Sequence, residues 1–571
     1  MQSRQLFNQI AHAQYKAARV DAGASQALAH VVIAKSAEHK YNSGMERKTI
    51  IEFLNEQARS GGHLSFHMPG HKGRASIYER TGYGDFISNI MACDITEIPG
   101  ADALFCPQTT LRAVMDNYAE LYGVRCSDLL VNGSSTGVMS AILSSVSVGG
   151  KLILGRNSHH SAFSALRLGG INPIYLRPET DRTTGLAMGI SPSELERACE
   201  ANPDAEAVLI TSPNYYGMLS DIAQLAIVAH EYDMILIVDQ AHGAHLKFFD
   251  NEAVQLQAEG AYIRHPKHAA ESLGADIVIN STHKTLLSFT GSGILNICTD
   301  RVDAGRVGEY LRMLQTTSPS YLLMGSLDVN ERIMRKYWPD IVKRWREDIT
   351  TFYRRASRIN GLTLIGAGPA SGQQSPQASG ISQQSSQTPE IGQEVPFGMY
   401  QRRVGLDMTK INISMASLGI SGAQLDLELR QHGIISEMVH GEFVMLMTGV
   451  GNLSSDYDRL LEVLRKISDS YGFVGRQPDD DDAGRRRPLS SGTFVLETSE
   501  MPLEFEDIPL YQADGRVLYD PVIIYPPGSP VACPGEVLTV EVIGHIADAL
   551  ERGEKVTGVD EEGMIRVGRY Y

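Results

Sequence analysis

Two short apolar runs of this chain end in residues that can do covalent and acid–base chemistry. The first run covers Met234 to Val238 and ends in Asp239, and the second covers residues 275–283 and ends in Lys284. Short β-branched runs that stop abruptly at polar residues are typical of buried parallel strands, which present functional groups at their carboxyl ends. A strand-end lysine can form a Schiff base with the aldehyde of pyridoxal phosphate, and a strand-end carboxylate can pair with the pyridinium nitrogen of that cofactor. The pair therefore predicts a pyridoxal-phosphate enzyme.

The segment that follows the acid adds further candidates. Asp239 is expected to keep the ring nitrogen protonated, because an ion pair at ~4 Å and an effective dielectric of ~20 is worth ~4 kcal/mol. Ala241 is small enough to pack under a flat ring, and His242 is placed to contact the ring or the substrate. An alternative is a metal-dependent hydrolase, since Asp239, His242 and His245 all carry oxygen or nitrogen ligands.

Polar residues around the lysine and after an earlier strand predict a phosphate site. Ser281 and His283 flank Lys284 and can donate hydrogen bonds to a phosphate, and glycines 291 and 293 allow close approach of the backbone. Residues 132–137 (Asn-Gly-Ser-Ser-Thr-Gly) follow a strand and open a helix, whose free N–H groups can bind an anion. A plain helix cap is the alternative for that turn.

Two histidine-containing turns are less specific. Residues 156–161 follow another strand, and an imidazole there can stack on a cofactor ring; the alternative is a polar turn with partly exposed histidines. Residues 66–73 contain a second His-Lys pair in a Pro/Gly loop with no strand leading into it. We expect this loop to lie at the edge of the active site or at an interface.

The chain between about 120 and 300 alternates short apolar strands with helical patterns, which predicts an α/β fold with a mostly parallel sheet and helices on both faces. A helix around 326–358 then leads to a small α+β unit with a strand at 410–414, a helix near 421–432 and a strand at 442–447. The strands expected in the sheet are 129–131, 151–154, 207–210, 234–238 and 276–279.

Composition shifts divide the chain. Residues 368–394 are rich in Ser, Gln, Gly and Pro and are expected to be disordered, and 475–492 form a charge-segregated linker. The predicted units are an N-terminal extension at 1–44, a cofactor-binding large domain at 45–330, a small α+β domain at 331–474 and a C-terminal α+β domain at 493–571.

Composition also narrows the function classes. The chain has 571 residues, 43% of them hydrophobic, so it can bury large cores, and its net charge of −16 argues against nucleic acid as a partner. Six scattered cysteines without a CxxC pair indicate a reducing compartment. Without an 18-residue apolar run or a secretory signal, we expect a cytoplasmic protein with no membrane span.

Taken together, these blocks resemble the Orn/Lys/Arg decarboxylase family in its shorter form, which lacks the N-terminal receiver-like wing. The likeness covers about residues 45–571 apart from the two low-complexity segments. The matching segments are 66–73, 94–100, 132–137, 156–161, 213–217, 239–245, 281–284, 418–422 and 525–536.

The resemblance implies an aspartate-aminotransferase-like fold (fold type I), a homodimer or higher oligomer with active sites at the subunit interface, and a C-terminal domain that closes over the site. By motif match, Lys284 is the Schiff-base lysine, Asp239 the pyridinium partner and His159 the ring-stacking histidine. The residues around the phosphate are then Ser134, Ser135, Thr136, Ser281 and His283.

The implied reaction is decarboxylation of a basic amino acid for polyamine biosynthesis, with arginine the first choice, lysine the second and ornithine the third. Lys284 or His242 is the expected general acid at Cα. Asp102 or Glu97, from the same chain or from the partner subunit, is the expected partner of the substrate's cationic end. Other pyridoxal-phosphate reactions, oxidation or transamination, stay open, as does a non-catalytic paralogue.

The chain departs from the family pattern at three places. Gln240 stands where the family usually has Glu, Ser529 replaces a usual Ile, and residues 101–110 replace a more acidic segment.

Overall fold

The computed structural model describes residues 48–59, 63–181, 184–258, 267–366, 405–472, 496–525, 530–551 and 553–569. The predicted extension 1–44, the predicted disordered insertion 368–394, the predicted linker 475–492 and Ser529 lie outside these described residues. Every helix within them is too short or too polar to span a bilayer.

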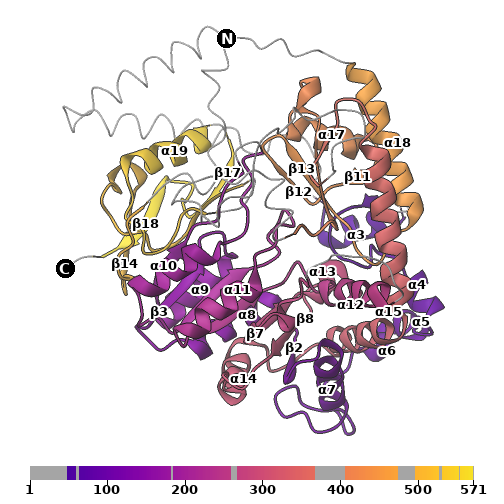
Figure 1. The fold of residues 1–571 in the computed structure, drawn as a ribbon, viewed down its shortest axis with the longest axis horizontal. Coiled ribbons are helices and arrows are strands. Elements are labelled where there is room, and N and C mark those ends of the chain that lie inside the picture. The colour runs from indigo at the N-terminus through magenta and orange to yellow at the C-terminus, as the bar shows by residue number, and fades with distance from the viewer. Residues whose placement is uncertain are drawn as a thin grey trace, which may run out of the picture.

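A seven-stranded sheet with the order β2-β8-β7-β6-β5-β3-β4 forms the centre of the molecule (Figure 1). Strand β8 runs antiparallel to both its neighbours, and the strands β3 to β7 are parallel to one another. The five strands expected from the sequence are all present, so the predicted α/β class is confirmed. Their bounds are β2 Cys126–Leu130, β3 Lys151–Gly155, β4 Asn172–Leu176, β5 Ala207–Thr211, β6 Ile235–Asp239, β7 Ile277–Asn280 and β8 Gly293–Ile297.

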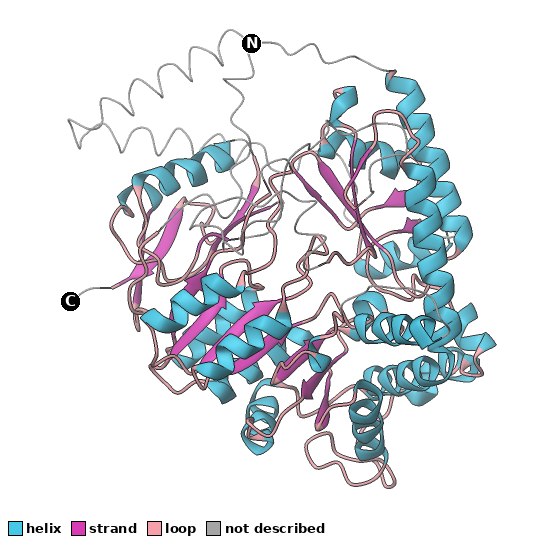
Figure 2. Cartoon of the chain, viewed as in Figure 1, coloured by secondary structure: helices cyan, strands magenta, loops and turns pink. Residues whose placement is uncertain are grey.

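Both faces of this sheet are apolar, as expected of parallel strands covered by helices. Ile237 of β6 belongs to the apolar core under α8 (Gly133–Ser145), α9 (His160–Gly169) and α14 (Ala304–Leu314). Its neighbours Leu236 and Val238 belong to the core on the opposite face, under α10 (Pro192–Ala201) and α11 (Ile222–Glu231). Figure 2 shows helices lying over the strands of this sheet.

The long helix α15 (Tyr321–Ala356) joins this large unit to a small one. The small unit has a four-stranded sheet of order β12-β13-β10-β9 and two helices. These elements match the predicted α+β unit, and their bounds are β9 Thr363–Leu364, β10 Lys410–Ser414, α17 Gly422–Gln431, β12 Met438–His440, β13 Phe443–Met447 and α18 Ser454–Tyr471.

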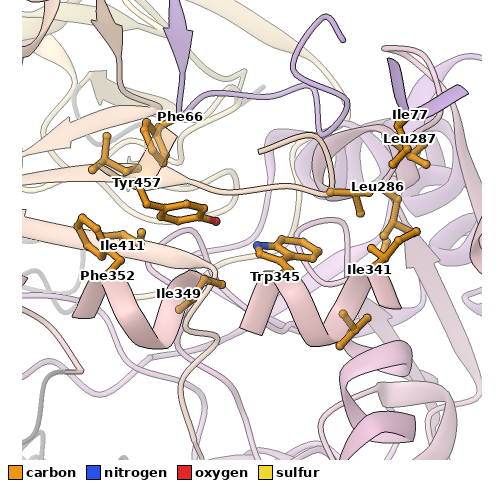
Figure 3. Close-up of a cluster of buried hydrophobic side chains, with 14 of the residues drawn as sticks. Phe66, Ile77, Leu286, Leu287, Ile341, Trp345, Ile349, Phe352, Ile411 and Tyr457 are labelled. Atoms are coloured by element: carbon orange, nitrogen blue, oxygen red, sulfur yellow. The ribbon is translucent and has the colours of Figure 1, made fainter. Parts of the chain in front are cut away.

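One apolar core runs from the large unit into the small one along α15. Figure 3 shows Trp345 and Ile341 of α15 beside Leu286, and Phe352 of the same helix beside Tyr457. Leu286 comes two residues after Lys284, so the turn that carries the lysine is anchored on α15.

The C-terminal unit has an apolar core of its own, which includes Leu518, Val542, Ile546 and Val567. Two small sheets and one helix surround it: β14 Phe505–Pro509 with β18 Met564–Gly568, then β16 Pro530–Ala532, β15 Val522–Tyr525 and β17 Lys555–Thr557, and α19 Val540–Glu551. It lies beside the large unit (Figure 1).

The remaining elements precede or connect those already described. The N-terminal ones are α3 Ile50–Arg59, β1 Leu64–Ser65, α4 Ser76–Arg80, α5 Gly84–Ser88, α6 Ile90–Cys93 and α7 Thr110–Tyr122. The others are α12 Leu246–Ala258, α13 Thr282–Thr285 and β11 Ile434–Ile435.

Candidate active site

Lys284 lies at the carboxyl end of β7, in the one-turn helix α13. Its Nζ is 3.1 Å from His242 Nε2, so the structure brings together two residues that are 42 positions apart in the chain. Burial lowers the pKa of Lys284 below its ordinary value, and the carboxylate of Asp239 opposes that shift. A lysine with a lowered pKa keeps more of its amine in the neutral, nucleophilic form.

Asp239 ends the neighbouring strand β6 and is 5% exposed. Its Oδ1 accepts a hydrogen bond of 3.1 Å from the Ala241 N–H, which fixes the carboxylate above the turn. Burial raises the pKa of Asp239, and the nearby Lys284 opposes that rise. The carboxylate therefore lies where water screens little, and a cationic partner there gains a strong contact.

His242 is buried between the lysine and an aromatic ring. The ring of Tyr215 meets it edge-on, with ring centroids 4.7 Å apart. Burial, together with the charge of Lys284, holds the pKa of His242 well below its usual range, so the imidazole is neutral. Its Nδ1 is buried and has no hydrogen-bond partner in the described part of the chain.

The turn before α8 meets the lysine turn. Ser281 Oγ donates a hydrogen bond of 2.7 Å to Ser134 Oγ, which joins the ends of β2 and β7. The side chain of the N-cap residue Asn132 accepts no hydrogen bond from α8, so it leaves the N–H groups at the start of that helix, around Ser135 and Thr136, free of a side-chain cap. An uncapped helix start with hydroxyl side chains suits a phosphate.

Two further histidines lie at this edge of the sheet. His159 is the N-cap of α9 and is half-buried; burial lowers its pKa to about 4, so its ring is neutral. His160 beside it is exposed. His283 is buried, and its Nδ1 donates to Ser292 O at 2.6 Å, which commits one of its ring nitrogens to the backbone.

The loop 66–73 packs directly on the lysine turn. The Gly70 N–H donates to His283 O at 2.7 Å, and a Cβ on Gly70 would lie 2.2 Å from Leu286 O. Only glycine fits this approach. The loop therefore lies against the turn that carries Lys284, at the edge of the candidate active site.

The buried Gln240 satisfies its amide completely. Its Nε2 donates to Glu271 Oε2 at 3.0 Å and to Asn280 Oδ1 at 3.1 Å, and its Oε1 accepts from the Ala270 N–H. The family's usual Glu at this position would put a second carboxylate against Glu271, where like charges repel. The neighbours of residue 240 therefore suit the neutral amide of Gln240, which is where this chain departs from the family pattern.

Asp102 and Glu97, which are expected at the substrate's cationic end from the same chain or from the partner subunit, lie in the segment before α7. Asp102 accepts hydrogen bonds from the backbone N–H groups of Gln108, Thr109 and Leu111, so it caps the start of α7. Glu97 is exposed.

Sequence reasoning missed three residues near Lys284: Asp407, Lys410 and Glu437. The side chain of Glu437 is 8% exposed, and its charge raises the pKa of Lys284. Lys410 Nζ donates to His242 O at 2.9 Å and to Asp407 Oδ2 at 2.8 Å. In the sequence Lys410 only begins a strand, so no local pattern pointed to this contact.

The alternative metal site finds no geometric support. Within the described ranges, no group of three or more His, Cys, Asp and Glu side chains is arranged to hold a metal ion. His242 faces Lys284, whereas His245 Nε2 donates to Asp407 Oδ1 at 3.1 Å.

Comparison with known proteins decides the family. The family model described as "Orn/Lys/Arg decarboxylase, major domain" matches residues 48–455. The chain belongs to the Orn/Lys/Arg decarboxylase family. It is 30% identical over 519 residues to the arginine decarboxylase of Bacillus subtilis, which covers 88% of this chain and 94% of that relative. It is 29% identical over 507 residues to the arginine decarboxylase of Halalkalibacterium halodurans, covering 87% and 93%.

The fold agrees with the family. The solved structure of lysine decarboxylase A from Pseudomonas aeruginosa superposes with a TM-score of 0.66 at 18% identity, covering 91% of this chain and 80% of that one. The predicted fold type I is therefore confirmed, and the protein is a pyridoxal-phosphate-dependent amino-acid decarboxylase.

The residues of the site fit the cofactor. Asp239 ends β6, and Lys284 follows the adjacent parallel strand β7. Asp239 is paired in register with Ile279 of β7, so both residues lie at the same edge of the sheet. Three buried polar atoms there have no partner within the described residues and can serve a polar ligand: Ser158 Oγ after β3, Thr211 Oγ1 at the end of β5 and His242 Nδ1 after β6.

Proposed function

We propose that this enzyme removes the α-carboxylate of a basic amino acid, with arginine the first choice, lysine the second and ornithine the third. The observation that carries the proposal is the pair Lys284 and Asp239 on adjacent strands, with His242 Nε2 3.1 Å from the lysine. The names of the arginine decarboxylase relatives support arginine.

We assign the cofactor contacts as follows. Lys284 would bond the aldehyde, Asp239 would pair with the ring nitrogen, His159 would stack on the ring, and Ala241 and His242 would contact it. The phosphate is held by Ser134, Ser135, Thr136, Ser281 and His283. When bound, pyridoxal phosphate accepts the electron pair that CO2 leaves behind at Cα.

The chain's own residues then control protons and orientation. Asp239 holds positive charge at the ring nitrogen, because a buried carboxylate stabilises a cation in contact with it. Lys284 and His242 lie within hydrogen-bond distance of each other, so either can deliver the proton that Cα needs after CO2 leaves. The aromatic contact of Tyr215 keeps the imidazole of His242 in place.

Glu437 is our candidate for the substrate's cationic end. Its side chain is almost fully buried, its Oε2 accepts from the Met68 N–H at 2.9 Å, and its charge reaches Lys284. A guanidinium or ammonium group brought there gains a charge-assisted hydrogen bond. Asp102 is less suited, because backbone N–H groups already fill its oxygens.

We also propose a cytoplasmic homodimer that acts in polyamine biosynthesis, divided into domains at 45–330, 331–474 and 493–571. Helix α3 supports a second copy: Ile50 and Phe53 on it are 78% and 51% exposed, an apolar surface that a partner would cover. All six cysteines are free thiols, which supports a reducing compartment.

The test is an absorbance spectrum of the purified protein, repeated with arginine, lysine and ornithine while CO2 is measured. We expect a band at ~400–430 nm that is absent from Lys284→Ala, and CO2 release with a basic amino acid. A cofactor band with keto acid as product instead of CO2 and amine would show oxidation or transamination and overturn the decarboxylase proposal.

A further inference from the structure

His242 and Lys284 belong to a closed ring of contacts, called the circuit below, that also includes Asp407 and Lys410, which no motif identified. It begins at His242, passes to Lys284 through the contact of 3.1 Å, and continues along the chain to Thr285. Thr285 Oγ1 is 3.2 Å from His245 Nδ1, and His245 Nε2 is 3.1 Å from Asp407 Oδ1.

Lys410 closes the circuit. Its Nζ donates to Asp407 Oδ2 at 2.8 Å, to Thr409 Oγ1 at 3.1 Å and to His242 O at 2.9 Å. An ammonium group has three protons to donate, and all three have acceptors here. The side chain of Lys410 is 0% exposed, so no water replaces a lost contact cheaply.

The charges in the circuit are fixed by their surroundings. Although burial by itself would raise it, Lys410 and His245 hold the pKa of Asp407 well below its usual range, so the carboxylate stays ionised. Burial lowers the pKa of His245, and Asp407 opposes that shift. A neutral His245 that donates from Nε2 to Asp407 accepts at Nδ1 from the Thr285 hydroxyl.

The circuit joins two units of the fold. Lys410 is the first residue of β10 in the small unit, whereas His242 follows β6 and Thr285 ends α13 in the large unit. Trp345 of α15 supports it, with its ring centroid 5.3 Å from that of His245. The small unit therefore holds the backbone of His242 directly.

We propose that Lys410, together with Asp407 and His245, is a positioning residue that sets the contact between His242 and Lys284. The role rests on the proposed function, in which that contact moves the proton at Cα. The small unit, through one buried ammonium group, thus fixes the geometry of the reacting pair.

A double-mutant cycle tests whether Lys410 acts through His242. We expect Lys410→Met to lower kcat by roughly tenfold to a hundredfold while KM changes by less than about threefold, because a misplaced general acid loses part of its contribution. In a His242→Asn background the same change should cost less than about threefold. An equal loss in both backgrounds would overturn the proposal.

A second measurement needs neither cofactor nor substrate, so it separates this proposal from the proposed function. Competitive acetylation of Lys284 in cofactor-free protein, followed over pH by mass spectrometry, reports the pKa of its amine. The Lys410 charge lowers that pKa, whereas Asp239 and Glu437 raise it. Lys410→Met should therefore shift the labelling curve to higher pH. An unchanged curve would overturn the proposal, even if decarboxylation were absent.

Asp276→Asn is the matched control for the labelling. Asp276 is 0% exposed and accepts from the Leu236 N–H at the far end of the same sheet. Its loss should leave the labelling curve of Lys284 in place, and a shift equal to that of Lys410→Met would show a general effect of lost buried charge.

If Lys410→Met fails to fold, two substitutions at Thr285 test the same circuit of contacts. Thr285→Val keeps the shape and removes the hydroxyl that meets His245, whereas Thr285→Ser keeps the hydroxyl. We expect Ser to retain more of kcat than Val, by about threefold or more. The reverse order would show that packing, and not the circuit, matters at this position.

Discussion

The ion pair Arg156–Glu536 and the ion pair Asp407–Lys410 are both buried, with side chains at most 3% exposed, but they serve different contacts. Arg156 binds the C-terminal unit, because its guanidinium donates to both oxygens of Glu536 and to Val531 O. Lys410 instead bonds the backbone of His242, next to the reacting lysine. Both pairs join units of the fold, and the Asp407–Lys410 pair also holds the backbone of His242 in the candidate active site.

The carboxylate that pairs with Arg156 is bound to the backbone of the C-terminal unit. Glu536 accepts a hydrogen bond from the Cys533 N–H, so the ion pair ties Arg156 to the turn at Cys533. Tyr175 reinforces this contact by donating to Pro534 O at 2.7 Å. A buried ion pair adds little net stability, but removing one partner is costly. We therefore expect a large effect from either substitution, on stability for the Arg156 pair and on kcat for the Lys410 pair.

The largest effect on activity is expected at the strand-end acid. Asp239→Asn should lower kcat by roughly a hundredfold to a thousandfold, the range for losing one preorganised electrostatic contact, while the cofactor stays bound. Steady-state CO2 release and the visible spectrum measure the two quantities. Asp276→Asn, at the opposite end of the sheet, should leave kcat within about threefold; a comparable loss there would remove the special role of Asp239.

Breaking the pair between units should cost stability. Glu536→Gln leaves the Arg156 guanidinium buried without its carboxylate, and we expect a loss of about 3–5 kcal/mol in the unfolding of the C-terminal unit. Limited proteolysis and thermal unfolding report it. The value of kcat for the folded fraction should change by less than about threefold, in contrast to Lys410→Met. A kcat loss as large as that of Lys410→Met would erase the distinction between the two pairs.

The close approach of the loop 66–73 to the lysine turn gives an intermediate effect. Gly70→Ala places a methyl group against the Leu286 carbonyl, so the backbone must move. We expect about 1–3 kcal/mol of destabilisation and a kcat loss of about tenfold. Gly308→Ala, inside α14 and with no atom within 4 Å of the added Cβ, is the control that should leave kcat unchanged and should not destabilise the protein. Wild-type kcat in Gly70→Ala would show that the loop does not hold the turn.

The smallest effect near neutral pH is expected from His283, which contributes to the pH dependence of stability only in acid. Burial lowers the pKa of His283 to about 4, against about 6.5 in an unfolded chain. Between these values the unfolded chain binds the extra proton, so stability is fully present above pH about 6.5 and falls as the pH drops towards about 4. Thermal unfolding of cofactor-free protein should show that fall, and His283→Gln should make it shallower, because other buried histidines such as His159 contribute in the same pH range. His160→Gln, at an exposed position, should not.

The strand-end residues could be predicted because their signal is local. Asp239 and Lys284 each follow an apolar run, and parallel strands bring their carboxyl ends to one edge whatever the rest of the chain does. The strands of the sheet and the small α+β unit were predictable for the same reason, since apolar periodicity and turn residues lie in neighbouring positions of the sequence.

The residues that hold this pair in place were decided only by the tertiary structure. Asp407 meets His245 across 162 positions of sequence, and Lys410 meets His242 across 168. Within its own chain Asp102 accepts hydrogen bonds from N–H groups at the start of α7, a contact that its acidity and position did not predict. A buried charge takes the partners that packing brings within reach, and sequence spacing does not encode that choice. The sequence by itself determined which chemistry the chain carries, and packing between the two units decided how its reacting groups are held.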